Sequence, residues 1–552
     1  MRTRSVTLLF FVLIFLNPLW ARSENQFRVT FPAAAHAGPI TGRVYMIVSR
    51  KEKASLLEDV GSWQEQTAFF ATDINALQPG KPATIDENAI GYPLASLKEL
   101  PTGEYYVQAL VNVYTEFHRS DGHVIWAHMD QWEGQQFSKS PGNLYSKVEK
   151  VQLDPAHPQT IELETLNVIP PVEVPPDTEW VKHVKLQSKL LSQFWGRPIF
   201  IGATVLLPKG YNDRLQTKYP VIYEQGHFSL RPPLFMQMDP PTPGDKRAEF
   251  RYETFQAWSG DHFPRMIAVT FQHPTVYFDD SYAVNSANNG PYGDAILQEL
   301  IPYLEEHFRM IREPWARVLM GGSTGGWESL ALQLYHPEFF GGTFTGFPDP
   351  IDFRRYQLVN IYKDPNAFDA PGFDWQQHAR PLMRTTEGQV IETEQEMSQL
   401  EETLGSHGRS GQQLEAWEAV YGPVGEDGYP LPLWNKHTGE INPTVANYMR
   451  DHGYDLRDYA EKNWARIGPQ LTNKIFIWVG DMDNFYLNLA VYDMEDFFKS
   501  HPEAHARFEY GRPEKGHGWL PWKPAEFIKM MADHMSANAP PGTDLSSWEQ
   551  VQ

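Results

Sequence analysis

The segment RVLMGGSTGGWESLALQLY, residues 317–335, constrains the fold of this chain more than any other stretch. An apolar run ends at two glycines, a single serine follows, and a helical pattern begins almost at once. A strand that turns so sharply into a helix needs glycines on both sides of the turn, because the two backbones come close together. The run Gly321-Gly322-Ser323-Thr324-Gly325 meets this requirement. The segment therefore predicts a strand–turn–helix unit that exposes the hydroxyl of Ser323.

The chain around this segment alternates between apolar runs and amphipathic ones. Continuous apolar strands joined by helices imply a sheet that is covered on both faces. We therefore expect an α/β fold with a mostly parallel sheet and helices on both of its faces. The expected strands are 196–208, 220–226, 266–272, 317–322, 341–347, 474–480 and 506–511, and the expected helices are 294–308, 326–335, 489–500 and 525–535.

At 552 residues the chain is too long for one domain. Residues 24–166 read as short strands separated by turns, without helical patterns between them, which predicts an N-terminal antiparallel β-sandwich. The proline-rich residues 167–183 predict an extended linker. The α/β domain is then expected over 184–540, followed by a flexible tail over 541–552.

Residues 1–23 have the layout of a secretory signal peptide, with two arginines, a short apolar run and small residues near its end. An uncleaved anchor is the alternative. After cleavage we expect a secreted or periplasmic protein without stable membrane insertion. The chain has no cysteine, which excludes thiolate nucleophiles and cysteine-based metal sites. Its net charge of -22 argues against a nucleic-acid partner.

A serine hydroxyl becomes a good nucleophile only when a base takes its proton and a carboxylate orients that base. In an α/β-hydrolase arrangement these residues follow in the order serine, acid, histidine. His517 lies in a glycine-flanked loop after the last predicted strand, and Asp481 and Asp483 follow the strand before it. Both aspartates remain candidates for the acid on this reasoning. Asp349 and Asp352, after the strand 341–347, are outside candidates.

Several stretches together resemble one known family. YPVIYEQGHF, NGPYGDAILQELIPYLEEHF, ARVLMGGSTGGWESLALQLYHPEFFGG, VGDMDNFY and KGHGW look like the putative-esterase group of α/β-hydrolases, which contains esterase D, feruloyl esterases and enterochelin esterases. The resemblance runs over about residues 184–537, with a large insertion. It implies that the acid is the aspartate of a Gly-x-x-Asp pattern, which is Asp483 here.

The same resemblance implies an oxyanion hole made of the backbone N–H groups of Thr324 and His227. The family has a His-Gly pair before the second of these donors, where this chain has Gln225-Gly226. We expect Gln225, Trp327 and Tyr486, which adjoin these motifs, to contact the substrate.

Residues 352–472 have no place in the minimal fold, and we expect them to form a helical lid over the sheet edge where ligands bind. The lid tryptophans are interpreted first as its core and second as substrate contacts: Trp375, Trp417, Trp434 and Trp464. The loop 276–294 is rich in oxygen side chains but lacks the spacing of a calcium loop, so we expect a solvated turn. No metal or other cofactor is predicted.

The sequence thus predicts an exported serine esterase that hydrolyses a small-molecule or glycan-linked carboxylic ester through an acyl-enzyme. An acyltransferase with the same residues is one alternative, and a catalytically silent glycan-binding protein on a hydrolase scaffold is another. A prolyl-oligopeptidase-type peptidase is disfavoured, because the N-terminal part lacks the repeats of a propeller.

Overall fold

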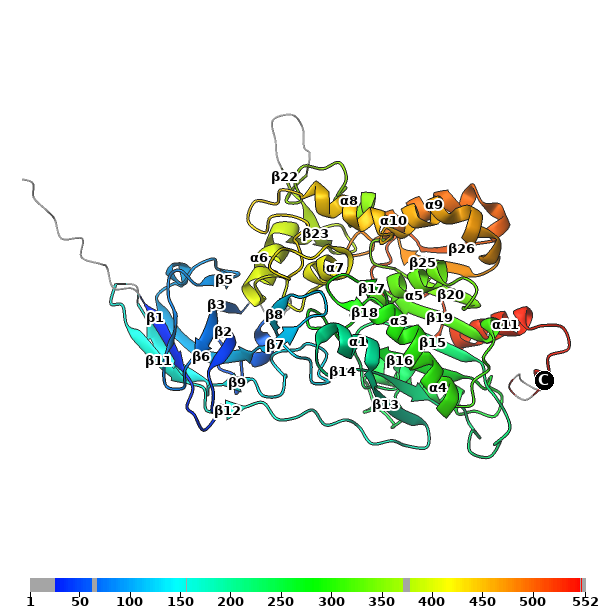
Figure 1. The fold of residues 1–552 in the computed structure, drawn as a ribbon, viewed down its shortest axis with the longest axis horizontal. Coiled ribbons are helices and arrows are strands. Elements are labelled where there is room, and N and C mark those ends of the chain that lie inside the picture. The colour runs from blue at the N-terminus through cyan, green and yellow to red at the C-terminus, as the bar shows by residue number, and fades with distance from the viewer. Residues whose placement is uncertain (1–24, 62–66, 155, 371–377, 547, 549–552) are drawn as a thin grey trace, which may run out of the picture.

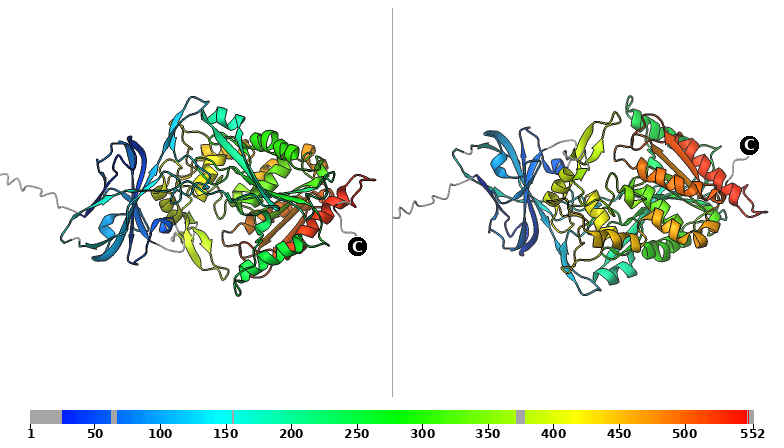
Figure 2. Two further views of the ribbon diagram at one scale, coloured as in Figure 1. Left: turned by 90° about the horizontal axis from the view of Figure 1, so that it is seen from below. Right: turned by 90° about the horizontal axis from the view of Figure 1, so that it is seen from above.

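The computed structural model describes residues 25–61, 67–154, 156–370, 378–546 and 548. The predicted signal peptide and Trp375 lie outside these residues. The N-terminal strands form one end of the molecule, a large insertion lies next to them, and the α/β part forms the other end (Figures 1 and 2). Over the described ranges, no helix is both long and apolar enough to cross a bilayer.

The α/β part is built on a sheet of eight strands, ordered β13-β14-β16-β15-β19-β20-β25-β26. The first two pairings are antiparallel and the remaining five are parallel. The parallel part agrees with the continuous apolar runs of the sequence, which suit strands buried on both faces. The strands are β13 (Val181–Ser188), β14 (Ile199–Leu206), β15 (Val221–Gln225), β16 (Ile267–Gln272), β19 (Arg317–Gly322), β20 (Gly342–Gly346), β25 (Ile475–Gly480) and β26 (Arg507–Gly511).

Both faces of this sheet are covered, as strand β25 shows. Ile475, Ile477 and Val479 pack into one apolar core, whereas Phe476 and Trp478 pack into another. Successive side chains of a strand point to opposite faces, so the two cores lie on opposite sides of the sheet. A π-helical turn at residues 296–300 joins α3 to α4. The helices of this part are α1 (Lys189–Trp195), α2 (Lys246–Trp258), α3 (Tyr292–Ala295), α4 (Ile301–His307), α5 (Thr324–Tyr335), α10 (Asn488–Lys499) and α11 (Pro524–Asn538).

Two sheets form the N-terminal part. One has the order β11-β1-β4, and the other has the order β12-β9-β6-β2-β3-β5, with β10 also paired to β6. The β1–β11 pairing is parallel, so the expectation of purely antiparallel strands does not hold here. The strands are β1 (Gln26–Thr30), β2 (Ile40–Ser49), β3 (Ala68–Leu77), β4 (Ala83–Ile85), β5 (Ile90–Tyr92), β6 (Gly103–Val113), β9 (Leu144–Tyr145), β10 (Glu149–Leu153), β11 (Thr160–Glu164) and β12 (Asn167–Val168), and a separate hairpin joins β7 (Thr115–His118) to β8 (Val124–Ala127).

The larger N-terminal sheet is also covered on both faces. Along β2, Val44 and Met46 belong to a core shared with β1 and β11 of the smaller sheet. Tyr45 and Ile47, which point the other way, belong to a core shared with the insertion. The larger sheet therefore lies between the smaller sheet and the insertion.

The insertion follows β20 and precedes β25, and it contains short strands as well as helices. Its strands form two hairpins, which the expectation of a purely helical segment did not include. The elements are β21 (Asp369–Ala370), β22 (His378–Ala379), β23 (Pro381–Arg384), β24 (Val390–Thr393), α6 (Glu394–Leu404), α7 (Gln413–Tyr421), α8 (Pro443–Asp451) and α9 (Leu456–Ile467).

Two segment expectations differ from the structure. Strand β12 and the start of β13 at Val181 lie inside the range 167–183 that the prolines marked as linker. Trp548, in the tail predicted to be flexible, is buried; its carbonyl accepts a hydrogen bond from the N–H of Arg265, and its ring stacks on Trp315. A large aromatic side chain that reaches an apolar surface orders its segment.

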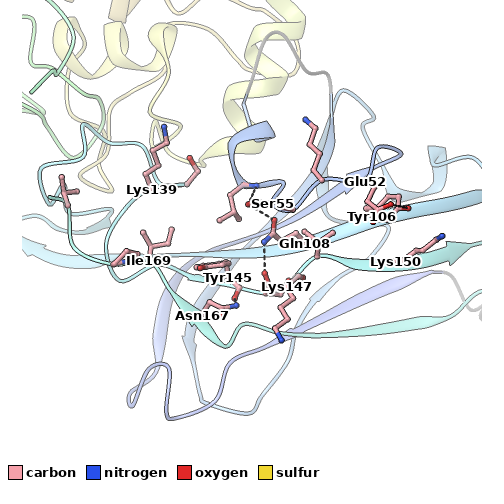
Figure 3. Close-up of a pocket in the computed structure, with 18 of the residues that line it drawn as sticks. Glu52, Ser55, Tyr106, Gln108, Lys139, Tyr145, Lys147, Lys150, Asn167 and Ile169 are labelled. Carbon is pink, nitrogen blue, oxygen red and sulfur yellow. Dashed lines mark hydrogen bonds between the residues drawn. The ribbon is translucent and has the colours of Figure 1, made fainter. Parts of the chain in front are cut away.

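A cavity of about 980 Å³ lies in the N-terminal part (Figure 3). Residues from β6, β9, β10 and β12 line it, together with residues 52–55, 57, 138–139, 146–148 and 169–172. Lys139, Lys147 and Lys150 stand around it with Tyr106 and Tyr145. None of the lining residues belongs to the predicted triad or oxyanion hole.

Candidate active site

Ser323 occupies a strained turn between β19 and α5. Its backbone angles are φ 58° and ψ -122°, which residues with side chains rarely adopt. A Cβ atom on Gly321 would lie 2.2 Å from the carbonyl oxygen of Gly325, and one on Gly325 would lie 2.1 Å from the carbonyl oxygen of Gln225. Only glycine permits approaches this close. The turn holds Ser323 at the carboxyl-terminal edge of the sheet.

His517 and Asp483 meet at the same edge. Nδ1 of His517 lies 2.8 Å from Oδ2 of Asp483, and the other carboxylate oxygen accepts the N–H groups of Phe485 and Leu487. Asp483 is fully buried just beyond the end of β25. Burial alone would lower the pKa of His517. The charge and the hydrogen bond of Asp483 outweigh burial, so the pKa of His517 is raised above its usual value. The imidazole is thus held in one orientation by a buried carboxylate.

The neighbouring acid candidates have other partners. Asp481 accepts the hydroxyl of Tyr492 at 2.6 Å and Nε of Arg512 at 2.8 Å. Asp352 forms an ion pair with Arg354. Of the four aspartates that the sequence left open, Asp483 is the one whose carboxylate contacts His517.

The fourth candidate, Asp349, contacts the serine rather than the histidine. The hydroxyl of Ser323 donates to Oδ1 of Asp349 at 3.2 Å, and among the described residues no hydrogen bond joins Ser323 to His517. Burial raises the pKa of Asp349, against the opposing effect of the hydrogen bond from Tyr282 and of the charges on His227 and His517. The other oxygen, Oδ2, accepts the hydroxyls of Tyr282 and Thr324, Nε2 of Gln413 and Nε1 of Trp417.

Phe347 connects the serine turn to the histidine loop. A Cβ atom on Gly322 would lie 2.4 Å from the Phe347 ring, and the centroid of this ring lies 4.8 Å from that of His517. The imidazole therefore stands one aromatic ring away from the strand end that carries Ser323. This proximity explains why the charge of Asp349 acts on His517.

The two expected oxyanion donors lie on adjacent segments. Thr324 is the first residue of α5, and His227 follows the end of β15, which contacts Gly325. Within the part of the chain that the structure describes, neither backbone N–H donates a hydrogen bond. Free N–H groups at a helix start beside a nucleophile can donate hydrogen bonds to an oxygen that gains negative charge.

The imidazole of His227 faces a pair of aspartates. Nδ1 lies 3.0 Å from Oδ1 of Asp279 and 3.5 Å from Oδ2 of Asp280. Desolvation lowers the pKa of His227, but Asp279 and Asp280 outweigh it and raise the pKa to about 10. The side chain is half exposed, so it forms the rim of the site.

The three predicted substrate contacts have different surroundings. Gln225 is buried, and neither polar atom of its amide has a partner among the described residues. Trp327 is fully buried against Tyr282 and Tyr421, so its ring is not offered to a ligand. Tyr486 is largely buried, with the guanidinium of Arg384 stacked 4.2 Å over its ring.

Sequence reasoning missed Tyr282 and Gln413, and it interpreted Trp417 first as lid core, because the groups that surround Asp349 come from distant segments. Tyr282 precedes the serine by about 40 residues, and Gln413 and Trp417 follow it on α7 in the insertion. One available signal was Glu328, a charged residue inside the otherwise apolar helix α5, where it is fully buried. Buried carboxylates of this kind cluster at functional sites.

Comparisons with known proteins give one family. Residues 199–533, more than half of the chain, match the model of a family described as "Putative esterase". A search of curated proteins found no match. Similar solved structures include a ferulic acid esterase, 16% identical over 64% of this chain and 99% of that chain, with a TM-score of 0.37.

Two further similar structures come from named organisms. A ferulic acid esterase from Anaeromyces mucronatus is 16% identical over 65% of this chain and 93% of its own, with a TM-score of 0.30. An S-formylglutathione hydrolase from Agrobacterium tumefaciens is 13% identical over 65% and 96%, with a TM-score of 0.30. All three TM-scores lie below 0.5, so the family assignment rests on the family match.

Proposed function

This chain belongs to the putative esterase family; from that premise we propose that it is a serine hydrolase of carboxylic esters, with Ser323, His517 and Asp483 as nucleophile, general base and orienting acid. One observation carries this proposal: the 2.8 Å contact between Nδ1 of His517 and buried Asp483, at the sheet edge that bears the strained Ser323 turn. A carboxylate on Nδ1 leaves Nε2 free to accept a proton.

The reaction begins when rotation about the Cα–Cβ bond of Ser323 turns its hydroxyl from Asp349 towards His517. Oγ attacks the ester carbonyl carbon while Nε2 of His517 takes the hydroxyl proton. The carbonyl oxygen becomes an oxyanion, which accepts the N–H groups of Thr324 and His227. His517 returns the proton to the leaving alcohol, and a water then releases the acyl group from Ser323 by the same steps.

The test combines labelling with turnover. Purified protein treated with a fluorophosphonate probe is expected to gain one adduct by intact mass, and Ser323→Ala is expected to gain none. Hydrolysis of p-nitrophenyl acetate should fall by several orders of magnitude in Ser323→Ala. Ser536→Ala, on α11, is the matched control and should keep both properties. An unlabelled wild type that is folded by circular dichroism would contradict the assignment.

We propose that residues 352–472 act as a lid that shapes the substrate pocket. Gln413 and Trp417 of α7 support this role, because both donate to the carboxylate that holds the Ser323 hydroxyl. Helix α7 therefore lies next to the place where an ester would meet Ser323. Substitution of Gln413 by alanine should change KM for bulky acyl groups more than for acetate.

The N-terminal sheets suggest a second function, favoured by the cavity of about 980 Å³. We propose that these sheets form a sandwich that binds an acidic oligosaccharide there. Four lysines and one glutamate line the cavity, in a chain of net charge -22, and tyrosine rings beside them suit contact with sugars. Lys53, Lys139 and Lys150 pair with nearby carboxylates, whereas Lys147 has no ion pair among the described residues. Ser323→Ala should bind oligogalacturonate more tightly than a neutral oligosaccharide, and Lys147→Glu should weaken that binding. Equal affinity for both sugars would contradict the proposal.

We also propose export, on the composition of residues 1–23. Protein secreted from cells that express the full chain should begin near Ser23 by mass spectrometry. An intact Met1 terminus on cell-associated protein would favour the anchor instead.

A further inference from the structure

A compact group of carboxylates lies behind the oxyanion loop. His227 follows β15, Asp279 and Asp280 follow β16, and Glu328 lies on α5. Ligand atoms of His227, Asp279 and Asp280 lie within 4.8 Å of one another, and so do those of Asp280, Glu328 and a further histidine, His273. Asp280 is common to both groups, so the five residues form one continuous cluster.

The imidazole of His227 pairs with Asp279 and Asp280, whereas Glu328 has no cationic partner among the described residues. Asp280 and Glu328 are 1% and 0% exposed. Both oxygens of Glu328 and Oδ2 of Asp280 lack a hydrogen-bond partner in the described part of the chain, and no described lysine or arginine pairs with Asp279, Asp280 or Glu328. Buried charges are normally paired or bound to a metal ion, because an uncompensated buried carboxylate is costly. Burial and the charge of Asp280 raise the pKa of Glu328 well above its usual value, so without a cation this group keeps a proton that it shares with Asp280. A divalent cation could take the place of that proton, because the Glu328 oxygens have no other partner among the described residues.

His273 is excluded as a ligand by its own hydrogen bonds. Its Nδ1 accepts the backbone N–H of Ser281 at 3.0 Å, which leaves the proton of the neutral ring on Nε2. Nε2 is buried in the cluster and has no acceptor among the described residues. A protonated Nε2 can donate to a carboxylate but cannot bind a metal, so His273 belongs to the outer shell.

The spacing of the remaining atoms fits a small divalent ion. A tetrahedral site with bonds of about 2.0–2.1 Å separates its ligand atoms by roughly 3.3 Å. In the structure, Nδ1 of His227 lies 3.0 Å from Oδ1 of Asp279 and 3.5 Å from Oδ2 of Asp280. One imidazole with carboxylates suits Zn²⁺ or a similar transition metal, whereas Ca²⁺ and Mg²⁺ prefer oxygen alone.

We propose that His227, Asp279 and Asp280 bind a divalent transition-metal ion of the Zn²⁺ class, with Glu328 beside Asp280 as a further carboxylate ligand. Binding releases the proton that Nδ1 of His227 shares with Asp279. The half-exposed imidazole gives the ion a path from solvent. Because the ligands come from two loops and from the helix that follows Ser323, the ion would fix the backbone of His227 relative to Thr324.

The binding experiment uses the full mature protein and two metal probes. Apo protein is incubated with ZnCl₂, freed of excess metal and analysed by elemental mass spectrometry; CoCl₂ is added separately and followed by visible absorption. We expect one Zn²⁺ per chain, a tetrahedral Co²⁺ spectrum, and a higher melting temperature with Zn²⁺. A wild type that retains no Zn²⁺ and gives only the spectrum of aqueous Co²⁺ would overturn the proposal.

Variants locate the ion. Asp280→Asn should weaken Zn²⁺ binding by more than about 100-fold, since loss of an outer-shell partner alone costs 10- to 100-fold. Asp279 is partly exposed, so Asp279→Asn should disturb folding less than Asp280→Asn does. It should also weaken Zn²⁺ binding. The matched control is Asp427→Asn. It removes a different His–Asp pair, in which Oδ2 of Asp427 lies 3.1 Å from Nδ1 of His407. Unchanged Zn²⁺ stoichiometry in both folded cluster variants would refute the assignment.

Discussion

At the scale of single residues, the site contains two buried carboxylates with different neighbours. Asp483 contacts the imidazole of His517, and Asp349 contacts the hydroxyl of Ser323. Both lie at the same sheet edge, which the parallel strands create by ending together. The proposed reaction therefore requires the serine to leave one carboxylate and to approach a base that is held by the other.

Substitutions of Asp483 and of its sequence neighbour Asp481 test which of the two is the orienting acid. Asp483→Asn should lower kcat by about 10⁴-fold, because an amide partner favours the wrong imidazole tautomer. Asp481→Asn should keep activity within a few-fold, since this carboxylate binds Tyr492 and Arg512 instead. Steady-state kinetics with p-nitrophenyl acetate measure both. Equal losses in the two variants would count against Asp483 as the acid.

The pH profile reports the charge around His517. The base must be neutral to accept a proton, and a raised pKa keeps it protonated to higher pH. As pH falls, kcat/KM should therefore be lost above the ordinary histidine pKa of about 6.5. Asp349→Asn removes a charge that raises this pKa and should move the acid limb to lower pH. An unmoved limb would show that Asp349 does not act on the imidazole.

At the scale of elements, the contact between β15 and α5 sets the geometry of the oxyanion hole. Gly325 of α5 lies directly against Gln225, two residues before His227. A strand end and a helix start that touch through backbone atoms cannot separate without moving both N–H donors. The glycines of the serine turn therefore position the donors as well as the nucleophile.

Gly325→Ala tests this contact. Its Cβ would lie 2.1 Å from a backbone oxygen, so the β15 loop must shift, and kcat/KM should fall by about 10²- to 10³-fold, as for loss of one oxyanion donor. Gly38→Ala, where the added Cβ meets nothing within 4 Å, is the control and should retain full activity. The hypothesis fails if Gly325→Ala is folded and fully active.

At the scale of the whole molecule, the N-terminal sheet and the insertion share one apolar core. Arg43 of β2 is buried at this junction; it donates to the carbonyls of Glu402 and Thr403 at the end of α6 and forms an ion pair with Asp73. The C-terminal carbonyls of a helix lack partners within the helix, so a buried arginine caps them. The insertion is thereby attached to the N-terminal part.

Arg43→Met should destabilise the protein through this junction. Each lost charge-assisted hydrogen bond costs about 1.5–3 kcal/mol of unfolding free energy. Arg28→Met breaks an exposed pair with Glu162 and should cost about 0–1 kcal/mol. Urea unfolding followed by tryptophan fluorescence compares the two variants. A cost for Arg43→Met no larger than that for Arg28→Met would mean that the junction contributes little.

Local sequence patterns predicted the strands and helices of the α/β part closely, because burial on two faces makes apolar runs continuous and the serine turn demands glycine. The same patterns identified Ser323, His517 and the aspartate pair at 481 and 483 as candidates. They missed β13, whose residues alternate weakly beside a proline-rich run, and the helices α1 and α2. They also made Trp327 a substrate contact, whereas the structure buries its ring.

What only the tertiary structure decided is which side chains meet. The choice between Asp481 and Asp483 depends on a loop that returns from the next strand, and the contacts of Asp349 join residues more than 60 positions apart. The cluster of His227, Asp280 and Glu328 likewise has no spacing signature, because three separate segments contribute to it. Sequence by itself determined the elements and the chemistry available to them, since those depend on neighbouring residues. Packing between distant segments determined which carboxylate faces which partner, because burial and charge act through space.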